Sequence, residues 1–282
     1  MTKGSAMRLR VLRVLALSLL GLGAISVGTS ASGGPVSPRV YEPVALADTQ
    51  IEFRGEPPRT ISTQTADGLA LEGAYWPPDE GVNQIVVVFH GNSYNHLVMA
   101  VRAEPLRVGG RGVLVASYRG FGDNPGKPSE TGIYRDAEAW IAKARELQPD
   151  ARTYLFGFSL GGAVALEMAT RYDVAGIATL GAFSSLRDAA PALLRPFVTE
   201  KYDNLETITR VSEPILLLHG TKDETIDLRM AEQLEQAGGA NVTRINLKGG
   251  GHWVPLDSIA EKIWRQWEAA QTHDPAGGEE AP

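Results

Sequence analysis

Short apolar runs rich in β-branched residues recur along the chain, each bounded by turn residues. Nearly continuous apolar runs are typical of strands that are covered on both faces. Upstream of them, two alternating segments flank Asp67-Gly68, a pairing that favours a tight turn between antiparallel strands. In chain order, the predicted strands are RTISTQT, LALEGAYW, QIVVVFH, GVLVASY, TYLFGF, GIATLGA, PILLLHG and TRINLK.

Segments with helical periodicity separate these strands. Strand and helix therefore alternate after an initial hairpin, which predicts an α/β fold with a doubly wound, mostly parallel sheet and an antiparallel start. The clearest helical segments are ETGIYRDAEAWIAKARELQ, LGGAVALEMATRY, DLRMAEQLEQAG and LDSIAEKIWRQWEAA.

The two ends of the chain differ from this pattern. Residues 1–31 carry four basic residues, a short uncharged apolar run and then small residues, which predicts a secretory signal cleaved after Ala31 and hence a periplasmic or secreted protein. The alternative is an uncleaved anchor that keeps the protein membrane-attached. Proline-rich residues 32–58 indicate a linker or a loosely docked arm, 59–271 the folded domain, and 272–282 a disordered tail.

Composition excludes several classes of chemistry and partner. The chain has 282 residues and no cysteine, which excludes disulfides, thiolate nucleophiles and cysteine-bound metal. Removal of the N-terminal segment would take away four positive charges and no acid, so the net charge would move from −6 to −10. That balance disfavours nucleic acid as a partner. Oligomeric state leaves no signal in the sequence.

A serine between glycines ends one predicted strand. In YLFGFSLGG, Ser159 lies directly before a helix, at the edge of the sheet where such folds bind ligands. A tight strand-to-helix turn is crowded, and Gly157 and Gly161 remove the side chains that would obstruct it. Gly162 would let the helix approach the sheet. We therefore predict Ser159 as a nucleophile; the structural alternative is a helix-capping serine.

A serine nucleophile needs a base, and the base needs an orienting acid. His252 follows the last predicted strand in LKGGGHW, and Asp223 follows a buried strand in PILLLHGTKDETI. The chain order serine, aspartate, histidine is the one associated with this type of turn. Glu224 and Asp227 are neighbouring acids, but Asp227 is better placed to begin the next helix.

An acyl-transfer site also needs two donors for the developing oxyanion. We predict the backbone N–H groups of Leu160, directly after the nucleophile, and Asn92, in the HGN turn after another strand. For His90 and His219 we favour buried rings that hold their loops by hydrogen bonds over a catalytic role. The predicted mechanism requires no cofactor and no metal.

Several of these segments occur together in a known family. The segments VVVFHGNSYNH, SYRGFGDNPGKPSETGIYRDAEA, LFGFSLGGAVAL and PILLLHGTKDETID resemble the α/β-hydrolase superfamily, within it the serine-aminopeptidase-like group, and especially the bud-emergence-related branch of that group. The resemblance covers about residues 60–270. It implies an α/β-hydrolase fold and a triad of Ser159, Asp223 and His252.

The chain departs from that family in two places. Asp123 and Asn124 stand where the family usually has a small residue, which suggests a specialised loop. About 30 residues separate the sixth and seventh predicted strands, too few for a large cap domain. Either this insert forms a short helical flap over an apolar pocket or it packs on the sheet; it holds Leu193, Leu194, Phe197 and Val198 near two prolines.

These features predict a serine hydrolase that cleaves carboxylic esters or thioesters of a small acyl substrate through an acyl-enzyme. A peptidase or amidase of the serine aminopeptidase type is one alternative, and a non-catalytic envelope-binding module is another. Tyr94, Phe121 and Trp253 are candidates to line the substrate pocket, with simple packing as the alternative for each. The N-terminal segment would bring the protein close to a membrane.

Overall fold

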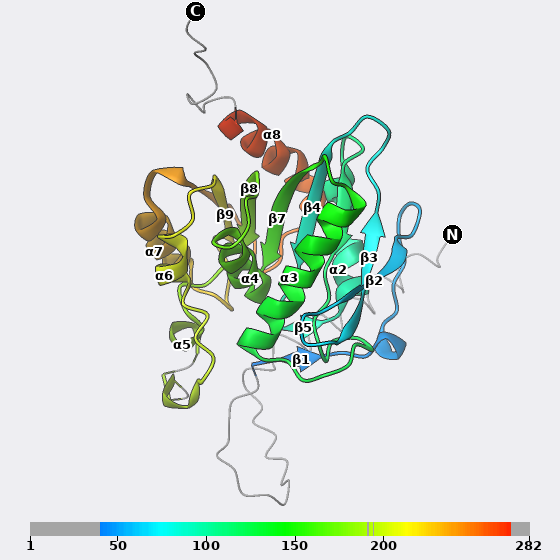
Figure 1. Ribbon diagram of the computed structural model, residues 1–282. Helices are drawn as coiled ribbons and strands as arrows, with labels where there is room; N and C mark the ends of the chain where they lie inside the picture. The colour runs from blue at the N-terminus through cyan, green and yellow to red at the C-terminus, as the bar shows by residue number, and fades with distance from the viewer. Residues whose placement is uncertain (1–39, 191, 194, 272–282) are drawn as a thin grey trace, which may run out of the picture. The chain divides into compact units, whose positions relative to one another are not determined.

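An eight-stranded sheet runs through the part of the chain that the computed structural model describes, residues 40–190, 192–193 and 195–271 (Figure 1). The strand order is β10-β9-β8-β7-β4-β6-β3-β2. The predicted signal segment 1–31, the tail 272–282 and Leu194 lie outside the described residues. The strands are β2 (Arg59–Gln64), β3 (Ala70–Trp76), β4 (Gln84–Phe89), β6 (Gly112–Val115), β7 (Arg152–Phe158), β8 (Gly176–Leu180), β9 (Ile215–Gly220) and β10 (Val242–Leu247).

The pairing of these strands confirms the predicted topology. β2 pairs antiparallel with β3, and β3 pairs antiparallel with β6. From β6 to β10 every neighbouring pair is parallel. The carboxyl ends of the parallel strands therefore meet at one edge of the sheet, and the loops that carry the candidate catalytic residues leave from that edge.

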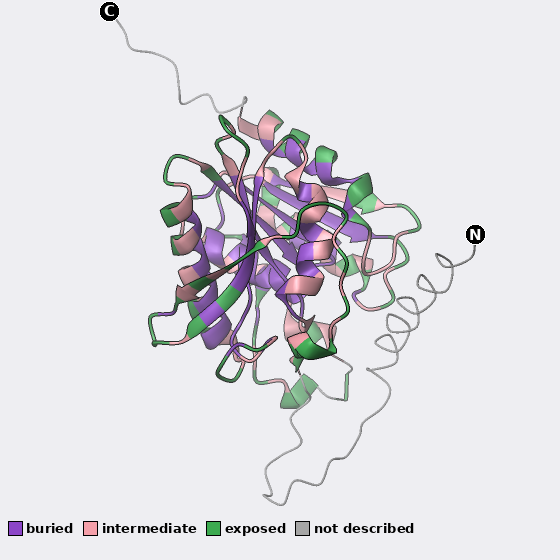
Figure 2. Ribbon diagram, turned by 90° about the vertical axis from the view of Figure 1, so that its right-hand side faces the viewer, coloured by how far each residue is buried: buried purple, intermediate pink, exposed green. Residues whose placement is uncertain are grey.

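Alternate side chains of the central strands enter two separate cores. In β4, Ile85 and Val87 pack in one core, whereas Val86 and Val88 pack in the other. This alternation is the period of a strand, and it requires helices on both faces of the sheet. Figure 2 shows the central strands as buried between these helices.

The helices divide between the two faces. Residues of α3, α4, α6 and α7 belong to one core, and residues of α2 and α8 belong to the other (Figure 1). The α-helices are α2 (His96–Ala103), α3 (Glu130–Leu147), α4 (Leu160–Ala169), α5 (Leu186–Ala189), α6 (Asn204–Ile208), α7 (Leu228–Gly238) and α8 (Ala260–Gln271). The 3-10 helices are η1 (Leu46–Asp48), η2 (Glu104–Arg107), η3 (Arg195–Phe197), η4 (Gly239–Asn241) and η5 (Leu256–Ser258).

Two features extend the expected fold. In the sequence, α2 follows β4 and precedes β6. The Asn95 side chain caps the start of α2 by accepting hydrogen bonds from the N–H groups of Leu97 and Val98. A two-stranded parallel pair joins β1 (Glu42–Pro43) to β5 (Ser93–Tyr94). No helix within the described residues is long and apolar enough to cross a membrane.

The described part of the predicted arm, residues 40–58, makes specific contacts with the domain. The Trp76 indole donates to the Glu56 carbonyl (2.8 Å), and Arg54 pairs with Asp257. Together with β1, these contacts hold the arm at several places along its length. The pairing of β1 with β5 places the arm beside the loop that follows β4.

The insert between β8 and β9 carries only the short elements α5, η3 and α6. It therefore forms no large cap, as its length predicted. Two apolar side chains of the insert, Leu193 and Phe197, are exposed to 84% and 52%. They face solvent and are not packed on the sheet.

Candidate active site

Ser159 occupies a strained turn between β7 and α4. Its backbone has φ 52° and ψ −116°, a conformation that residues with a side chain rarely adopt. The Ser159 N–H donates to the Leu180 carbonyl (2.9 Å) at the end of β8, which ties the turn to the neighbouring strand. Strain held by surrounding structure at a sheet edge is typical of a functional position.

Two glycines make room for this turn, as the sequence predicted. A Cβ on Gly157 would lie 2.2 Å from the Gly161 carbonyl oxygen, and a Cβ on Gly161 would lie 2.1 Å from the Phe89 carbonyl oxygen. Both atoms belong to backbone, which cannot move aside without disturbing the sheet. At Gly162 the nearest atom, the Ala182 Cβ, would be 3.2 Å away, so that position is tight but less restricted.

His252 and Asp223 meet although 29 residues separate them. The His252 Nδ1 donates to the Asp223 Oδ2 (2.8 Å), and the Asp223 side chain is fully buried. The other oxygen, Oδ1, accepts from the N–H groups of Thr225 and Ile226 (2.8 and 2.9 Å). Burial alone would raise the pKa of Asp223, but the His252 contact and these N–H donors outweigh it and lower that pKa below its usual range.

Close packing of two loops brings this pair together. A Cβ on Gly220, at the end of β9, would lie 2.2 Å from the Gly251 carbonyl oxygen, so the loop before His252 passes directly over the strand before Asp223. The Lys222 N–H also donates to the Gly250 carbonyl (2.8 Å). Gly220, Gly250 and Gly251 therefore allow the two loops to approach each other closely.

The imidazole of His252 lies beside the Ser159 turn. Its ring centroid is 5.0 Å from that of Phe158, and a Cβ on Gly181 would touch its Cε1 at 2.9 Å. Gly181 directly follows Leu180, the residue that accepts from Ser159. Within the described chain no hydrogen bond joins the ring to the Ser159 hydroxyl; such bonds often tighten only when substrate binds.

The predicted oxyanion donors lie on either side of Ser159, the predicted nucleophile. α4 begins at Leu160, so the Leu160 N–H belongs to the first helical turn and has no carbonyl partner within the helix. On the other side, a Cβ on Gly91 would lie 3.5 Å from the Ser159 Cβ, which places the Gly91–Asn92 turn against the nucleophile. The Asn92 side chain points toward the arm and donates to the Val40 carbonyl (3.1 Å).

His90 supports the Gly91–Asn92 turn, which carries one of the predicted oxyanion donors. Its Nδ1 donates to the Gly91 carbonyl (2.8 Å), and its ring packs 4.2 Å from Tyr118 and 4.9 Å from Phe121, measured between centroids. Burial lowers the pKa of His90 to about 3. The ring is therefore neutral and structural. The fully buried Phe121 supports His90 and, as packing, does not line an open pocket.

His219 lies beside Asp223, the predicted orienting acid. Its Nε2 donates to the Ile226 carbonyl (2.9 Å) and lies 3.3 Å from the Asp223 Oδ2. The ring is fully buried. His219 thus holds the loop that curls around Asp223. Asp227, the neighbouring acid, caps α7 by accepting from the Arg229 N–H, as expected for a helix start.

Tyr94 and Trp253, the other two predicted pocket residues, lie together at the site. Both rings contact the guanidinium of Arg102, a residue of α2 that sequence reasoning missed. The signal was an arginine on an otherwise apolar helix, HLVMAVRA. Tyr94 also has a positive φ of 70°, so its loop carries strain close to the nucleophile.

The departures in the loop after β6 have a structural explanation. The Asn124 side chain accepts from the Glu72 N–H (2.8 Å) and donates to the Glu72 carbonyl (3.2 Å), which completes the pairing of β3. Asp123 accepts from the Leu46 N–H in the arm (3.4 Å). This loop is thus specialised for holding the sheet edge and the arm.

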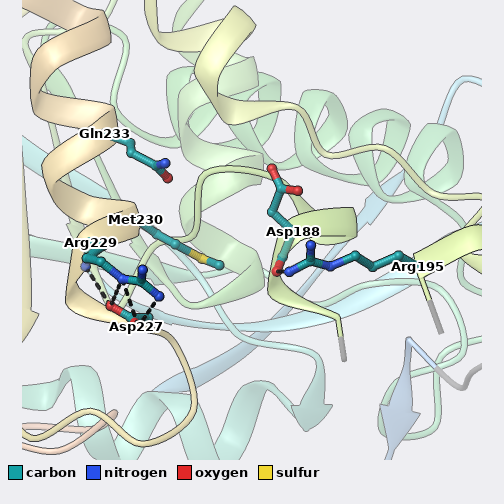
Figure 3. Close-up of a pocket in the computed structure, with 6 residues that line it drawn as sticks. All are labelled: Asp188, Arg195, Asp227, Arg229, Met230 and Gln233. Atoms are coloured by element: carbon teal, nitrogen blue, oxygen red, sulfur yellow. Dashed lines mark hydrogen bonds and ion pairs between the residues drawn. The ribbon is translucent and has the colours of Figure 1, made fainter. Parts of the chain in front are cut away.

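A separate hollow of about 300 Å³ lies between the insert and α7 (Figure 3). It includes none of the predicted site residues. No group of three or more metal-binding side chains occurs within the described residues. The residues lining this hollow are Asp188, Arg195, Asp227, Arg229, Met230 and Gln233.

Comparison with known proteins identifies the family. A family model described as alpha/beta hydrolase fold matches residues 84–201. Uncharacterized protein Rv2307c of Mycobacterium tuberculosis is 34% identical over 206 residues, which cover 70% of this chain and 73% of that protein. The chain belongs to the α/β-hydrolase superfamily. Alpha/beta hydrolase domain-containing protein 17B of Homo sapiens is 30% identical to this hydrolase over 139 residues, 48% of each chain.

Solved structures agree on the fold of this α/β hydrolase. The esterase Pf2001 of Pyrococcus furiosus superposes with a TM-score of 0.62 at 17% identity, covering 83% of this chain and 96% of the esterase. XC6422 of Xanthomonas campestris, a serine hydrolase without a lid, superposes with a TM-score of 0.59 at 18% identity, covering 77% and 98%.

Proposed function

We propose that this protein is a serine hydrolase that cleaves carboxylic esters or thioesters through an acyl-enzyme. The Ser159 hydroxyl attacks the carbonyl carbon while the His252 Nε2 takes its proton. The tetrahedral intermediate collapses, and the protonated His252 gives that proton to the leaving alcohol or thiol. Water then attacks the acyl-enzyme with His252 again as base, releasing the acid and restoring Ser159.

The observation that carries this proposal is the hydrogen bond from the His252 Nδ1 to the buried Asp223 beside a strained serine. With its proton on Nδ1, the neutral ring keeps Nε2 free of a proton and able to accept one. The lowered pKa of Asp223 keeps the carboxylate charged, so it stabilises the imidazolium that forms during each step.

The surroundings of Ser159 support the same chemistry. The N–H groups of Leu160 and Asn92 belong to turns on either side of the nucleophile, where two donors could stabilise an oxyanion. Loss of one such donor typically costs about 3–4 kcal/mol of transition-state stabilisation. The short insert between β8 and β9 leaves the site without a large cap.

Labelling by a fluorophosphonate probe tests the proposal directly. We expect the wild-type protein to be labelled and Ser159→Ala to remain unlabelled, because the probe reacts only with an activated serine. Asp223→Asn should slow ester turnover by several orders of magnitude while the fold remains intact, because the ring loses its orienting carboxylate. Equal labelling of the wild type and Ser159→Ala would exclude Ser159 as the nucleophile.

A panel of short-chain esters, acyl thioesters and aminoacyl amides defines the substrate class. We expect turnover of esters and thioesters to exceed that of amides. Selective turnover of the aminoacyl amides would instead establish a peptidase. The absence of both labelling and turnover, under conditions where a known serine hydrolase reacts, would leave a binding module as the remaining function.

A further inference from the structure

The guanidinium of Arg102 contacts three aromatic rings, and each ring adjoins a different catalytic loop. The Arg102 Cζ lies 4.7 Å from the centroid of Trp253, 5.2 Å from Tyr94 and 6.0 Å from Phe158. Trp253 directly follows His252, the proposed base, and Phe158 directly precedes Ser159, the proposed nucleophile. Tyr94 lies in the loop that also carries Asn92, a proposed oxyanion donor. A cation is thereby fixed next to the reacting centre.

No carboxylate in the described part of the chain pairs with this half-buried cation. The acid nearest in sequence, Glu104, accepts hydrogen bonds from the N–H groups of Arg54 and Gly55 in the arm (3.2 and 2.9 Å). Burial lowers the pKa of Arg102, whereas Tyr94 acts to raise it. Guanidinium remains charged in proteins and has five N–H donors. The three ring faces and one side-chain hydrogen bond to Tyr94 do not satisfy all five.

We propose that Arg102 binds a negatively charged group of the substrate, a carboxylate or phosphate carried on either the acyl chain or the leaving group. This inference rests on the proposed function and names the class of ester that the same site selects. The planar fork of a guanidinium can donate two parallel hydrogen bonds to either anion. Contact with the rings fixes that fork in advance, which reduces the entropy lost on binding.

The shape of the site restricts how the anion reaches Arg102. The hollow that Arg102 lines with Gly91, Ser93 and Phe158 holds only about 10 Å³, the size of one water molecule. The anionic group therefore meets the guanidinium at the mouth of this hollow and does not enter it. From there the scissile carbonyl extends toward Ser159, the residue after Phe158.

Arg107 provides a matched control. It also stacks on an indole, with its Cζ 5.2 Å from the Trp76 centroid, but this contact involves none of the catalytic loops. If the contacts of Arg102 were only structural, loss of either arginine would change the turnover of all esters alike. A binding role for Arg102 predicts a change that depends on substrate charge.

The experiment measures kcat/KM for two matched pairs of esters. The acyl arm compares the 4-nitrophenyl monoester of adipic acid with 4-nitrophenyl hexanoate, and the leaving-group arm compares 4-acetoxybenzoate with its methyl ester. In at least one arm, Arg102→Gln should lower the ratio of anionic to neutral kcat/KM by about tenfold or more. Arg102→Lys should lower it less because the charge remains, and Arg107→Gln should leave it unchanged.

Three results would overturn the inference. An unchanged ratio in both arms would show that Arg102 does not bind the anion, and an equal loss on both members of each pair would show a structural role. Failure of the wild-type protein to react with the fluorophosphonate would remove the proposed function and this inference with it. If Arg102→Gln does not fold, the wild-type ratio decides: it should fall as NaCl rises from about 20 mM to about 500 mM, and a constant ratio would contradict the proposal.

Discussion

Ser159 keeps a backbone conformation that costs on the order of 1–3 kcal/mol and persists only because its neighbours enforce it. Gly157 and Gly161 allow the helix to begin within contact distance of β7 and β4. The strain and the close approach are two aspects of one turn. Any side chain at these glycines would force apart backbone segments that position Ser159, the proposed nucleophile.

Gly161→Ala should therefore destabilise the protein by about 2 kcal/mol or more and abolish labelling of Ser159, because the new Cβ overlaps the Phe89 carbonyl. Gly162→Ala is the control, since its Cβ would lie 3.2 Å from the Ala182 side chain and 3.4 Å from the Thr179 side chain, and its three nearest atoms include no backbone. That variant should lose less stability and keep its labelling. Urea unfolding gives the free energies, and equal losses in the two variants would contradict this account of the turn.

At the level of the elements, one buried arginine connects a loop, a helix and a hairpin. Arg119, after β6, donates to Asp136 in α3 (2.7 Å) and to Asp67 in the turn between β2 and β3 (2.8 Å). Gly132 in α3 makes room for it, since a Cβ there would lie 2.7 Å from the Arg119 Cδ. This packing gives a physical reason for the YRGFG and PSETG segments that suggested the family.

Asp136→Ala should cost about 3–5 kcal/mol, because it leaves the Arg119 charge buried without its closest partner. The exposed pair of Arg54 and Asp257 is the control, and Asp257→Ala should change stability by less than about 1 kcal/mol. Denaturant unfolding measures both free energies. A similar small loss in the two variants would show that the Arg119 cluster adds little to stability.

At the scale of the whole described domain, two histidines that follow β4 in the chain, His90 and His96, are buried. Burial lowers the pKa of His90 to about 3 and that of His96 to about 4. In the unfolded chain both would titrate near the ordinary value of about 6.5. Unfolding therefore takes up protons below that value, so this contribution to stability is present above it and is lost as the pH falls toward 4.

His96→Phe isolates this effect. Replacement by an apolar ring removes the proton uptake of one histidine, so the stability of the variant relative to wild type should rise by about 2 kcal/mol between about pH 7 and about pH 5. The measurement is urea unfolding of both proteins at each pH. A difference that does not change with pH would show that folding leaves the pKa of His96 unchanged.

Sequence patterns determined most of the architecture of this hydrolase. Each of the eight strands was expected within a few residues, because buried strands and tight turns leave strong local signals. α2 and the β1–β5 pair were missed, since two-residue strands and a short helix leave weak ones. The tight turn at Ser159 could also be predicted, because the glycines that allow it lie next to Ser159 in the sequence.

Only the tertiary structure determined which residues that are distant in the sequence contact one another. Asp223 and His252 were predicted because each follows a strand. The 2.8 Å contact between them depends on the close packing of their two loops, where Gly220 meets Gly251. Phe121 was proposed for a pocket and lies in the core, because its ring supports His90. Arg102 left only a weak signal in the sequence, an arginine in an apolar helix. The rings around it, Tyr94, Phe158 and Trp253, are distant in the sequence, and only the packing of their segments brings them together.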